Sequence, residues 1–429
     1  MSVTQNEKIR QVTESTLVIG VDIASESHWA RAFDWRGIEH DRAFQFENSS
    51  AGFAQLLHWI EMLCSKTGKT RVIIGAEPTG HYWFTLVAYL KSSEIKLVLV
   101  NPHHVKKSKE LDDNDPSKND RKDPKVIAKL VLEGRYSEPY IPEGIYADLR
   151  VAMNVRWRIQ RELTASKNQI QRWLKIYFPE HGDVFADYSC ASSMAVLLEA
   201  PLPADLIALG ADGINAIWRK MKLRAVGKKK AARLLSAATI SVGCKAGIAA
   251  ARMELRMLLE DYAAKQRQYE EIMAVVEGLC EQLPEVAELL KIKGIGLVSV
   301  AGFLAETGDI RRFDSPKQIQ KLAGLSIRSN SSGKFQGRSS ISKRGRSRLR
   351  AVLFRAAISL VGKYGNQEFR ELHRYYTTRE NNPLKRKQSI IAMSCKLIRV
   401  FYALVTKGVA YDPVKLLADI HRNQPPKAA

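Results

Sequence analysis

The first 145 residues alternate between short apolar runs and segments with helical spacing. Five runs have the length and composition of strands: residues 17–21, 29–35, 42–46, 71–76 and 95–100. Apolar positions recur at helical spacing in three segments: residues 53–63, 81–90 and 124–130. Three successive strands followed by alternating helices and strands are typical of a mixed sheet with helices on its faces. The pattern therefore predicts an α/β N-terminal domain.

Two long helices are predicted next. Residues 146–178 carry an apolar stripe, and between 156 and 175 their other faces hold six Lys or Arg against the single acid Glu162. Such a face is either simply solvated or in contact with phosphate. Residues 250–280 repeat apolar side chains every seven positions, which is a coiled-coil pattern that Lys265 interrupts. The sequence does not decide whether this helix pairs within the chain or with another subunit.

The remaining pattern is mainly helical. Residues 180–250 indicate only small helices, whereas residues 349–360, 368–379 and 385–407 each have clear helical spacing. The fold class predicted for the whole chain is α/β plus α. The predicted organisation is a flexible tail at 1–15, an α/β domain at 16–145, a helical coiled-coil region at 146–290, a helical domain at 291–412 and a tail at 413–429.

Net charge indicates the kind of partner. The chain has 67 Lys and Arg against 45 Asp and Glu, a net charge of +22, and a pI near 9.7. An excess of this size favours a polyanion, usually nucleic acid. We expect no membrane association, because no run of 18 apolar residues occurs and the first residues are too polar for a signal peptide. The five scattered cysteines contain no CxxC pair, so we expect no zinc site, no disulfide framework and a cytoplasmic location.

Four carboxylates are candidates for the chemistry. Asp22 ends one apolar run and Glu77 directly follows another, whereas Asp120 and Asp123 lie three positions apart before a helical segment. A spacing of three places two side chains on one helical face. Hard cations such as Mg²⁺ or Mn²⁺ take oxygen ligands, so these acids predict a divalent-metal site for phosphodiester chemistry. We expect residues 101–124 to form a mobile loop that brings Asp120 and Asp123 to the site.

A second group of candidates lies beyond residue 290. Gly294 and Gly296 form a Gly-x-Gly turn, which indicates either a helix-hairpin-helix that offers backbone N–H groups to a phosphate or a tight interhelical turn. Residues 328–350 then contain eight Lys or Arg and no acid, among many Ser and Gly. This segment either only binds phosphate or also holds a nucleophilic serine, and composition does not select the serine. The predicted nucleic-acid contacts are Gly294, Gly296, Arg328, Lys334, Arg338, Lys343, Arg344 and Arg346.

An ordered set of short motifs resembles one known family. In the first third these are Gly20-Val21-Asp22-Ile23-Ala24, Glu77-Pro78-Thr79-Gly80 and Asp120-Arg121-Lys122-Asp123. In the last third they are Gly294-Ile295-Gly296, Ala323-Gly324-Leu325, Ser332-Gly333 and Ser342-Lys343-x-Gly345. Together they resemble the DEDD-type insertion-sequence transposases, also described as bridge-RNA-guided recombinases, over about residues 16–145 and 290–410.

The resemblance carries specific expectations. It implies a RuvC-like, ribonuclease-H-like N-terminal domain in which Asp22, Glu77, Asp120 and Asp123 hold Mg²⁺ or Mn²⁺. It implies a C-terminal transposase domain in which Ser332 is the nucleophile and forms a covalent phosphoserine–DNA intermediate. The implied partners are donor and target DNA, a non-coding RNA encoded by the element, and further copies of the chain in a dimer or tetramer. The implied location is the bacterial cytoplasm, at the nucleoid when active.

This sequence departs from the family in one place, and other functions stay open. The family usually has Asn-Lys-Thr-Asp where this chain has Ser117-Lys118-Asn119-Asp120. One alternative is a RuvC-like nuclease that activates water with metal, without covalent serine chemistry. A second is a non-enzymatic, nucleic-acid-binding repressor. A covalent protein–DNA adduct separates the recombinase from the nuclease, and metal-dependent cleavage excludes the repressor.

Overall fold

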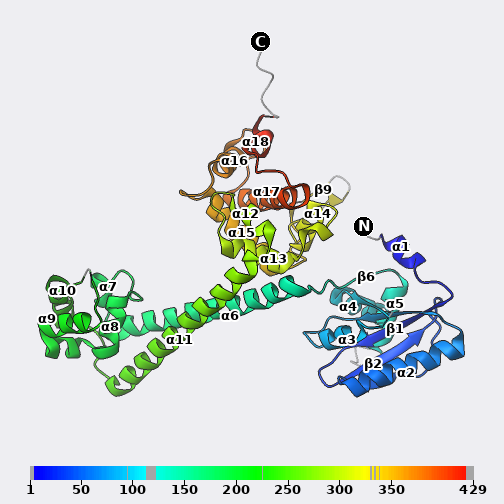
Figure 1. Ribbon diagram of the computed structural model, residues 1–429, viewed down its shortest axis with the longest axis horizontal. Coiled ribbons are helices and arrows are strands. Elements are labelled where there is room, and N and C mark those ends of the chain that lie inside the picture. Colours follow the sequence, from blue (N-terminus) through cyan, green and yellow to red (C-terminus); the bar gives the residue numbers. More distant parts are fainter. Residues whose placement is uncertain are drawn as a thin grey trace, which may run out of the picture. The chain divides into compact units, whose positions relative to one another are not determined.

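A computed structural model describes residues 4–93, 95–112, 122–224, 226–328, 331–332, 335–337 and 339–421. It divides into two compact units, Met1–Ile141 and Pro142–Ala429. Figure 1 colours the chain along its sequence, with the first unit in blue to cyan. Each unit has its own hydrophobic core and is described by itself.

The N-terminal unit is built on a six-stranded sheet in the order β3-β2-β1-β4-β5-β6. The strands are β1 (Thr16–Asp22), β2 (Ser27–Phe33), β3 (Phe44–Glu47), β4 (Arg71–Ala76), β5 (Lys96–Val100) and β6 (Tyr136–Ser137). Strands β1, β4 and β5 are parallel, whereas β2, β3 and β6 run antiparallel to their neighbours. The predicted mixed sheet is confirmed with its five predicted strands, and the short strand β6 was not predicted.

Helices cover both faces of this sheet. They are α2 (Ser50–Thr67), α3 (Trp83–Leu90), α4 (Pro102–Asp112) and α5 (Asp123–Leu132), whereas α1 (Gln5–Arg10) has no buried residue. Side chains alternate along β1, so that Leu17 and Ile19 pack with α2 and α3, whereas Val18 packs with α4 and α5. Two helices lie where none was predicted: α1 lies in the expected tail, and α4 replaces the first half of the expected loop at 101–124.

Two glycines let helix α5 lie directly on the sheet. A Cβ built on Gly20 of β1 would lie 1.8 Å from the carbonyl oxygen of Pro124, and one built on Gly75 of β4 would lie 2.4 Å from Val131. No side chain fits in either space. The start of α5 is therefore fixed against the carboxyl end of β1.

The second unit begins with a long helical hairpin. Helices α6 (Gly144–Tyr177) and α11 (Ile248–Glu281) each have 34 residues and pack along each other. Trp173 donates a hydrogen bond from Nε1 to the Ala251 carbonyl oxygen at 2.9 Å, and Lys265 pairs with Glu162 at 2.8 Å. The predicted coiled coil is thus paired within the chain.

A small helical subdomain connects the two long helices. It consists of α7 (His181–Val184), α8 (Ala191–Glu199), α9 (Pro203–Lys220) and α10 (Lys228–Thr239). It has a separate core in which Trp218, Leu206 and Leu234 are fully buried. We call these residues, 178–247, the tip subdomain, because they lie at the turn of the hairpin (Figure 1).

The chain ends in a mainly helical domain, as predicted. Its helices are α12 (Pro284–Leu290), α13 (Leu297–Thr307), η1 (Ile310–Arg312), α14 (Pro316–Leu322), α15 (Ser347–Val361), α16 (Gln367–Thr378), α17 (Arg386–Lys407) and α18 (Pro413–His421). Its short strands are β7 (Ile327–Arg328), β8 (Ser331–Ser332), β9 (Phe335–Gln336) and β10 (Ser340–Ile341). The start of α6 and the end of α11 join its core through Leu149 and Val276.

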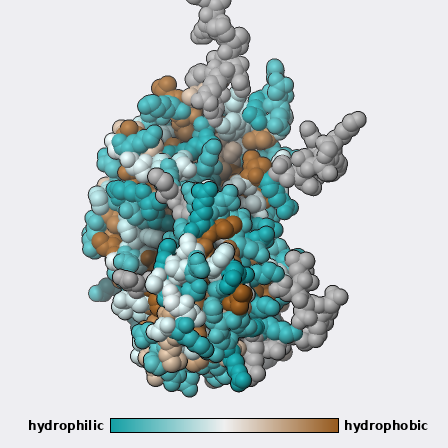
Figure 2. Space-filling model, turned by 90° about the vertical axis from the view of Figure 1, so that its right-hand side faces the viewer, coloured by the Kyte–Doolittle hydropathy of each residue, from teal (hydrophilic) through white to brown (hydrophobic). Residues whose placement is uncertain are grey.

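Helix α17 is long and apolar enough by composition to cross a membrane. Among the described residues no other single helix meets this criterion. Helices α8 and α9 meet it only if they are counted as one segment, and the angle between them is 115°. Its buried side chains, among them Met393, Leu397 and Phe401, belong to the core of the C-terminal domain. Figure 2 shows a mainly hydrophilic face with hydrophobic side chains in separate patches. Helix α17 is therefore the core helix of a folded domain.

Candidate active site

The strand register brings two of the predicted acids to one edge of the sheet. Val21 of β1 pairs with Ala76 of β4 in parallel, and the next residues are Asp22 and Glu77. Neighbouring strands lie about 4.8 Å apart, so the two carboxylates leave the sheet side by side. Asp22 ends its strand, and Glu77 follows its strand directly. The sequence-based placement of both residues at strand ends is confirmed.

Helix α5 brings a third acid to the same edge. Asp123 is the first residue of α5 and is only 8% exposed. The next residue, Pro124, packs over Gly20, which precedes Asp22 by two positions. Lys109 of helix α4 forms an ion pair with Asp123, with 2.5 Å between Nζ and Oδ2.

The electrostatics of Glu77 show that these groups influence one another. Burial raises the pKa of Glu77, the positive charge of Lys109 lowers it, and the negative charge of Asp123 raises it again. Two carboxylates are thus held near each other with a lysine as their neighbour, an arrangement that costs free energy. Such an unfavourable arrangement at the ends of strands marks a candidate functional site.

The donor set fits a hard divalent cation. Asp22, Glu77 and Asp123 offer carboxylate oxygens, which are the ligands that Mg²⁺ and Mn²⁺ prefer. Asp120 lies outside the described residues. Among the residues that the structure describes, no three His, Cys, Asp or Glu are close enough together to hold a metal ion. The described part of the site therefore contains the expected donors but not a closed set of ligands.

The Gly-x-Gly turn connects α12 to α13. Gly294 has φ +91°, and a Cβ there would lie 3.3 Å from the backbone of Gly365 and Asn366. The hydroxyl of Ser359 donates to the Gly294 carbonyl oxygen at 3.1 Å. Gly296 caps the N-terminus of α13, and a Cβ built there would meet nothing within 4 Å. The turn is thus anchored on one side and open in front of the helix start.

The serine-rich segment is a β-hairpin closed at its base. Ser342 donates from its N–H to the Ser326 carbonyl oxygen at 2.8 Å, and β7 pairs with β10. Strand β8, which contains Ser332, pairs with β9. The side chain of Ser332 lies outside the described residues, as do Lys334 and Arg338 entirely.

Two motif glycines hold the ends of this hairpin together. A Cβ on Gly345 would lie 2.7 Å from the Gly324 nitrogen, and a Cβ on Gly324 would lie 2.9 Å from the Arg344 carbonyl oxygen. Both glycines have positive φ, +66° at Gly324 and +145° at Gly345. Of the predicted phosphate contacts that are described here, Arg328, Lys343 and Arg344 are exposed.

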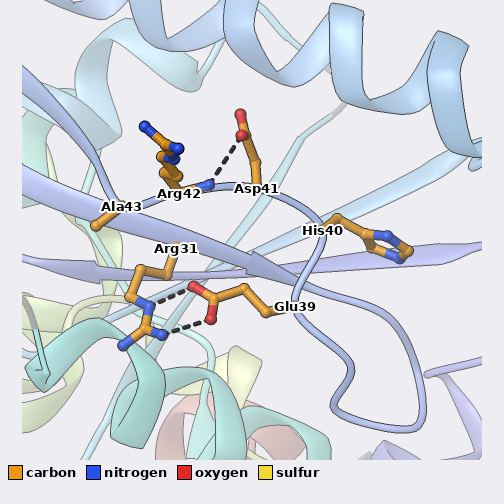
Figure 3. A pocket seen from close by; sticks show the side chains of 6 residues that line it. All are labelled: Arg31, Glu39, His40, Asp41, Arg42 and Ala43. Carbon is orange, nitrogen blue, oxygen red and sulfur yellow. Dashed lines mark hydrogen bonds and ion pairs between the residues drawn. The ribbon is translucent and has the colours of Figure 1, made fainter.

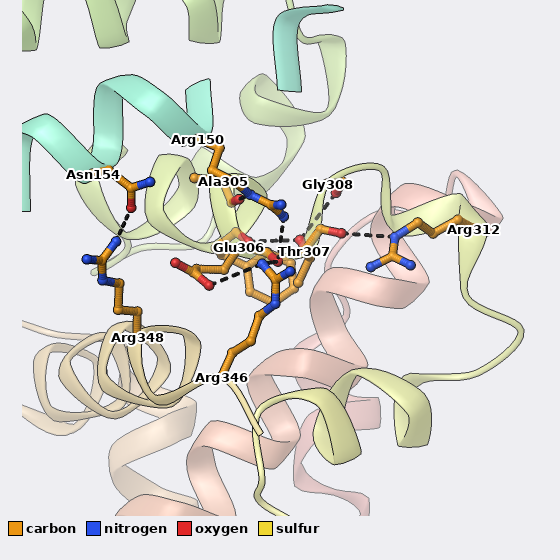
Figure 4. Close-up of polar contacts among 10 residues, drawn as sticks. Arg150, Asn154, Ala305, Glu306, Thr307, Gly308, Arg312, Arg346 and Arg348 are labelled. Carbon is orange, nitrogen blue, oxygen red and sulfur yellow. Dashed lines mark hydrogen bonds and ion pairs between the residues drawn. The ribbon is translucent and has the colours of Figure 1, made fainter. Parts of the chain in front are cut away.

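Arg346 has a partner inside the protein. Its guanidinium donates to the Glu306 carbonyl oxygen at 2.9 Å and pairs with the Glu306 carboxylate at 3.4 Å. Arg150 donates to the Ala305 carbonyl oxygen at 2.9 Å, and Arg312 donates to that of Thr307 at 3.0 Å (Figure 4). Three arginines thus cap the C-terminus of α13. The sequence did not indicate Arg150 or Arg312, since their targets are backbone carbonyls.

A hollow of about 560 Å³ lies beside the connection between β2 and β3 and is lined by Arg31, Glu39, His40, Asp41, Arg42 and Ala43 (Figure 3). Its charges are mostly satisfied locally. Arg31 pairs with Glu39 at 2.5 Å, and Asp41 accepts from Trp59 Nε1 at 2.9 Å. The hydrogen bond from Trp59 lowers the pKa of Asp41. These contacts fix the connection, and none of the predicted site residues lines the hollow.

Comparison with known proteins gives two family matches. A model described as "Transposase", of the DEDD type of IS110 elements, matches residues 19–179. A model described as "Transposase IS116/IS110/IS902 family" matches residues 286–374. The first match runs from β1 to the end of α6, and the second from α12 into α16. Most of the tip subdomain lies between them.

Individual relatives agree with these matches. A putative transposase of Sinorhizobium fredii, y4rJ, is 32% identical over 133 residues, 31% of this chain and 33% of the relative. The pilin gene-inverting protein of Moraxella bovis is 31% identical over 126 residues, 29% of this chain and 38% of the relative. Both alignments cover less than half of the relative. The transposase for insertion sequence element IS1111A of Coxiella burnetii is 23% identical over 408 residues, 94% of each chain.

Proposed function

We propose that the chain cuts and rejoins DNA as a transposase, because it matches both family models of IS110-type transposases and resembles a transposase over 94% of its length. The observation that carries the proposal is the convergence of acids at one sheet edge. Asp22 and Glu77 follow paired residues of neighbouring parallel strands, and α5 brings Asp123 to them. The excess of 22 positive charges over the whole chain supports a polyanionic substrate.

We assign Asp22, Glu77, Asp120 and Asp123 as the residues that would hold Mg²⁺ or Mn²⁺. Bound there, the metal would neutralise charge on the scissile phosphate. The Lys109–Asp123 ion pair supports this assignment, because it shows that the Asp123 carboxylate already holds a cation at this edge of the sheet. The strand order 3-2-1-4-5 around parallel β1 and β4 supports a RuvC-like fold for this domain.

We assign Ser332 as the nucleophile. Its oxygen would attack the phosphorus of a DNA backbone linkage, forming one O–P bond while the bond to a deoxyribose oxygen breaks. The deoxyribose oxygen leaves as a free hydroxyl, which takes up the proton that the serine hydroxyl gives up. The reverse step, with the hydroxyl of another strand, rejoins the DNA. The base of the hairpin that carries Ser332 is anchored by Gly324 and Gly345, and exposed Arg328 and Arg344 lie near it in sequence. The hairpin that carries Ser332 is thus anchored at its base and has cations nearby that could neutralise negative charge on the reacting phosphate.

The finer parts of the proposal concern partners. An RNA encoded by the element would pair with donor and target DNA, and copies of the chain would assemble so that the acids of one copy meet the serine of another. The Gly294–Gly296 turn would bind a backbone phosphate as a helix-hairpin-helix, since the start of α13 is open there. Sequencing of RNA that co-purifies with the protein tests the RNA partner.

The experiment for the proposed function is strand cleavage of element-end DNA with co-purified RNA, in Mg²⁺ and in EDTA. Cleavage should require the metal and should be lost in Asp22→Asn and Asp123→Asn. Lys106→Gln, which changes an exposed residue of α4, is the matched control and should cleave as wild type does. Cleavage that survives in EDTA, or in both acid variants, would contradict the proposal. Binding without any cleavage would favour the repressor.

A further inference from the structure

The tip subdomain carries a dense positive surface that the proposed active site does not use. Between residues 219 and 233, eight of fifteen residues are Lys or Arg, and none is acidic or aromatic. We call these eight residues the tip surface: Arg219, Lys220, Lys222, Arg224, Lys228, Lys229, Lys230 and Arg233. All but the half-buried Lys230 are exposed. The surface covers the end of α9, the start of α10 and the turn that connects them.

The fold directs these cations outward. Helices α9 and α10 pack together, and α10 places Ala231, Leu234 and Ala238 in the tip core. The opposite side of α10 then carries its basic residues. A hollow of about 500 Å³ lies at its start, lined by Val184, Val226, Gly227, Lys228, Lys229, Lys230 and Arg233. The tip surface is therefore concave as well as charged.

The positive charge is only partly neutralised inside the protein. Lys220 pairs with Glu199 at 3.0 Å, and Lys228 pairs with Asp212 at 3.1 Å. Lys222, Arg224 and Lys229 form no ion pair with any residue that the structure describes. Pairs as exposed as the two that do form contribute little. An uncompensated excess of positive charge thus remains on this surface.

The placement of the lysines is unfavourable for the protein alone. Lys228, Lys229 and Lys230 occupy the first turn of α10, where the helix dipole favours negative charge. Lys230 is held in place, with Nζ 4.3 Å from the centre of the Phe185 ring. Cations gathered against the helix dipole cost free energy, and an external anion would offset that cost.

We propose that the tip surface binds the phosphate backbone of double-stranded DNA, outside the segment that is cut. Lysines and arginines in a segment that contains no aromatic residue suit backbone phosphates rather than unstacked bases, which proteins bind by aromatic stacking. The choice of DNA over other duplexes rests on the proposed function. The tip surface binds without sequence preference, because it offers charges to a backbone that is the same in every sequence.

The length of the hairpin determines where this DNA lies. Helices of 34 residues are about 50 Å long, at 1.5 Å per residue. The tip surface is thus separated from the Ser332 hairpin by roughly the length of 15 base pairs of DNA, at 3.4 Å per pair. DNA that reaches both must extend at least that far beyond the reacting linkage. A shorter duplex that is held at the reacting linkage does not reach the tip surface.

The experiment compares the full-length wild type with Lys222→Asn/Arg224→Gln/Lys229→Gln. These three residues have no ion pair to lose among the described residues, and Asn is well tolerated at the positive φ of 52° that Lys222 adopts. The matched control, Arg10→Gln/Lys66→Gln/Lys69→Gln, removes three cations from helix α1, from the last turn of α2 and from the connection after it. Binding is measured against salt concentration on three duplexes: DNA of about 60 base pairs, DNA of about 20 base pairs and RNA of about 60 base pairs. The two long duplexes exceed the length of the hairpin on either side of the reacting linkage, and the short one does not. Melting temperatures check that all proteins are folded.

On long DNA, the slope of log affinity against log salt should be shallower in the tip variant than in wild type, by about 2 to 3. Each lost phosphate contact accounts for about 0.9 of this difference. Its slope on short DNA, and its cleavage of short DNA, should match wild type, and the control should match wild type throughout. An unchanged slope on long DNA overturns the proposal, and so does a loss confined to the RNA duplex. Failure of the proposed function appears separately, as wild type that cleaves no DNA, because the slope does not depend on cleavage.

Discussion

The Nζ of Lys109 lies 2.5 Å from Oδ2 of Asp123. This ion pair joins helices α4 and α5, which lie before and after the segment that contains Asp120. The pair is only partly exposed, with 38% of the Lys109 side chain and 12% of the Asp123 side chain accessible. Lys109 also lowers the pKa of Glu77, against the effects of burial and of Asp123. One lysine therefore offsets negative charge on two of the proposed metal ligands.

The first prediction follows from this competition for the carboxylates. Lys109→Gln removes the internal cation, so the apo protein should become less stable and should gain more stability from Mg²⁺ than wild type does. A several-fold tighter apparent affinity corresponds to about 1 kcal/mol. Thermal unfolding over a series of Mg²⁺ concentrations measures both effects. Lys106→Gln should behave as wild type, and an equal or smaller response to Mg²⁺ in Lys109→Gln would contradict the role given to Lys109.

The second prediction concerns the contact that positions Asp123. Gly20→Ala introduces a Cβ 1.8 Å from the Pro124 carbonyl oxygen, so α5 must move away from β1. We expect a loss of about 3 kcal/mol in the free energy of unfolding of the N-terminal unit, together with loss of cleavage. Urea unfolding measures the first effect.

The same substitution elsewhere in the chain is the control. Gly278 lies within helix α11, and a Cβ built there would meet nothing within 4 Å. Gly278→Ala should therefore be neutral or stabilising, by up to about 1 kcal/mol. Equal effects of the two substitutions would show that helix packing on Gly20 is not what holds α5.

The third prediction is a pH dependence of the tip subdomain. His181 is 1% exposed, and its Nδ1 has no hydrogen-bond partner among the described residues. Burial, with a smaller contribution from the charge of Lys230, lowers the pKa of His181 to about 4. Since the folded state disfavours the protonated ring, stability is complete above the unfolded pKa near 6.5 and falls as the pH drops from 6.5 towards 4. The loss reaches roughly 3 kcal/mol at the low end of that range.

Hydrogen exchange of the tip amides at pH 7.5, 6 and 5, corrected for intrinsic exchange rates, measures this dependence. Protection should fall with pH in wild type. His181→Gln lowers protection at pH 7.5, because its hydrogen bond with Ser193 and its contact with Phe185 are changed, but it should remove the dependence on pH. Equal protection of the wild-type tip at pH 7.5 and 5 would contradict this prediction.

The sheet and the long helices were predictable because their signals are local. The run at 71–76 coincides with β4, and the helix predicted at 146–178 coincides almost fully with α6. Parallel strands carry their end residues to one edge, so the proximity of Asp22 and Glu77 followed from the same pattern. In contrast, Pro102–Asp112 has few apolar residues and forms helix α4, which its composition did not indicate.

Contacts between distant residues were not predictable, although some of their signals were visible. Lys265 interrupts an apolar seam, and Glu162 is the single acid among the basic residues 156–175, yet only the fold shows that they pair at 2.8 Å. The roles of Gly324 and Gly345 required the structure for the same reason, because they contact each other across 21 positions. The sequence pattern predicted only small helices at 180–250, whereas α9 has 18 residues, and the separate core that it forms with α10 became visible only in the structure.

The central claim, that the acids of the first domain and Ser332 act on one phosphorus, has one direct test. Wild type, Ser332→Ala, Ser331→Ala and Asp123→Asn are incubated with labelled element-end DNA, co-purified RNA and Mg²⁺, and the covalent protein–DNA adduct is quantified after denaturation. The account predicts an adduct on the Ser332 peptide in wild type and Ser331→Ala, and none in Ser332→Ala or Asp123→Asn. An adduct that persists in Ser332→Ala, or that forms equally well in Asp123→Asn, would contradict it.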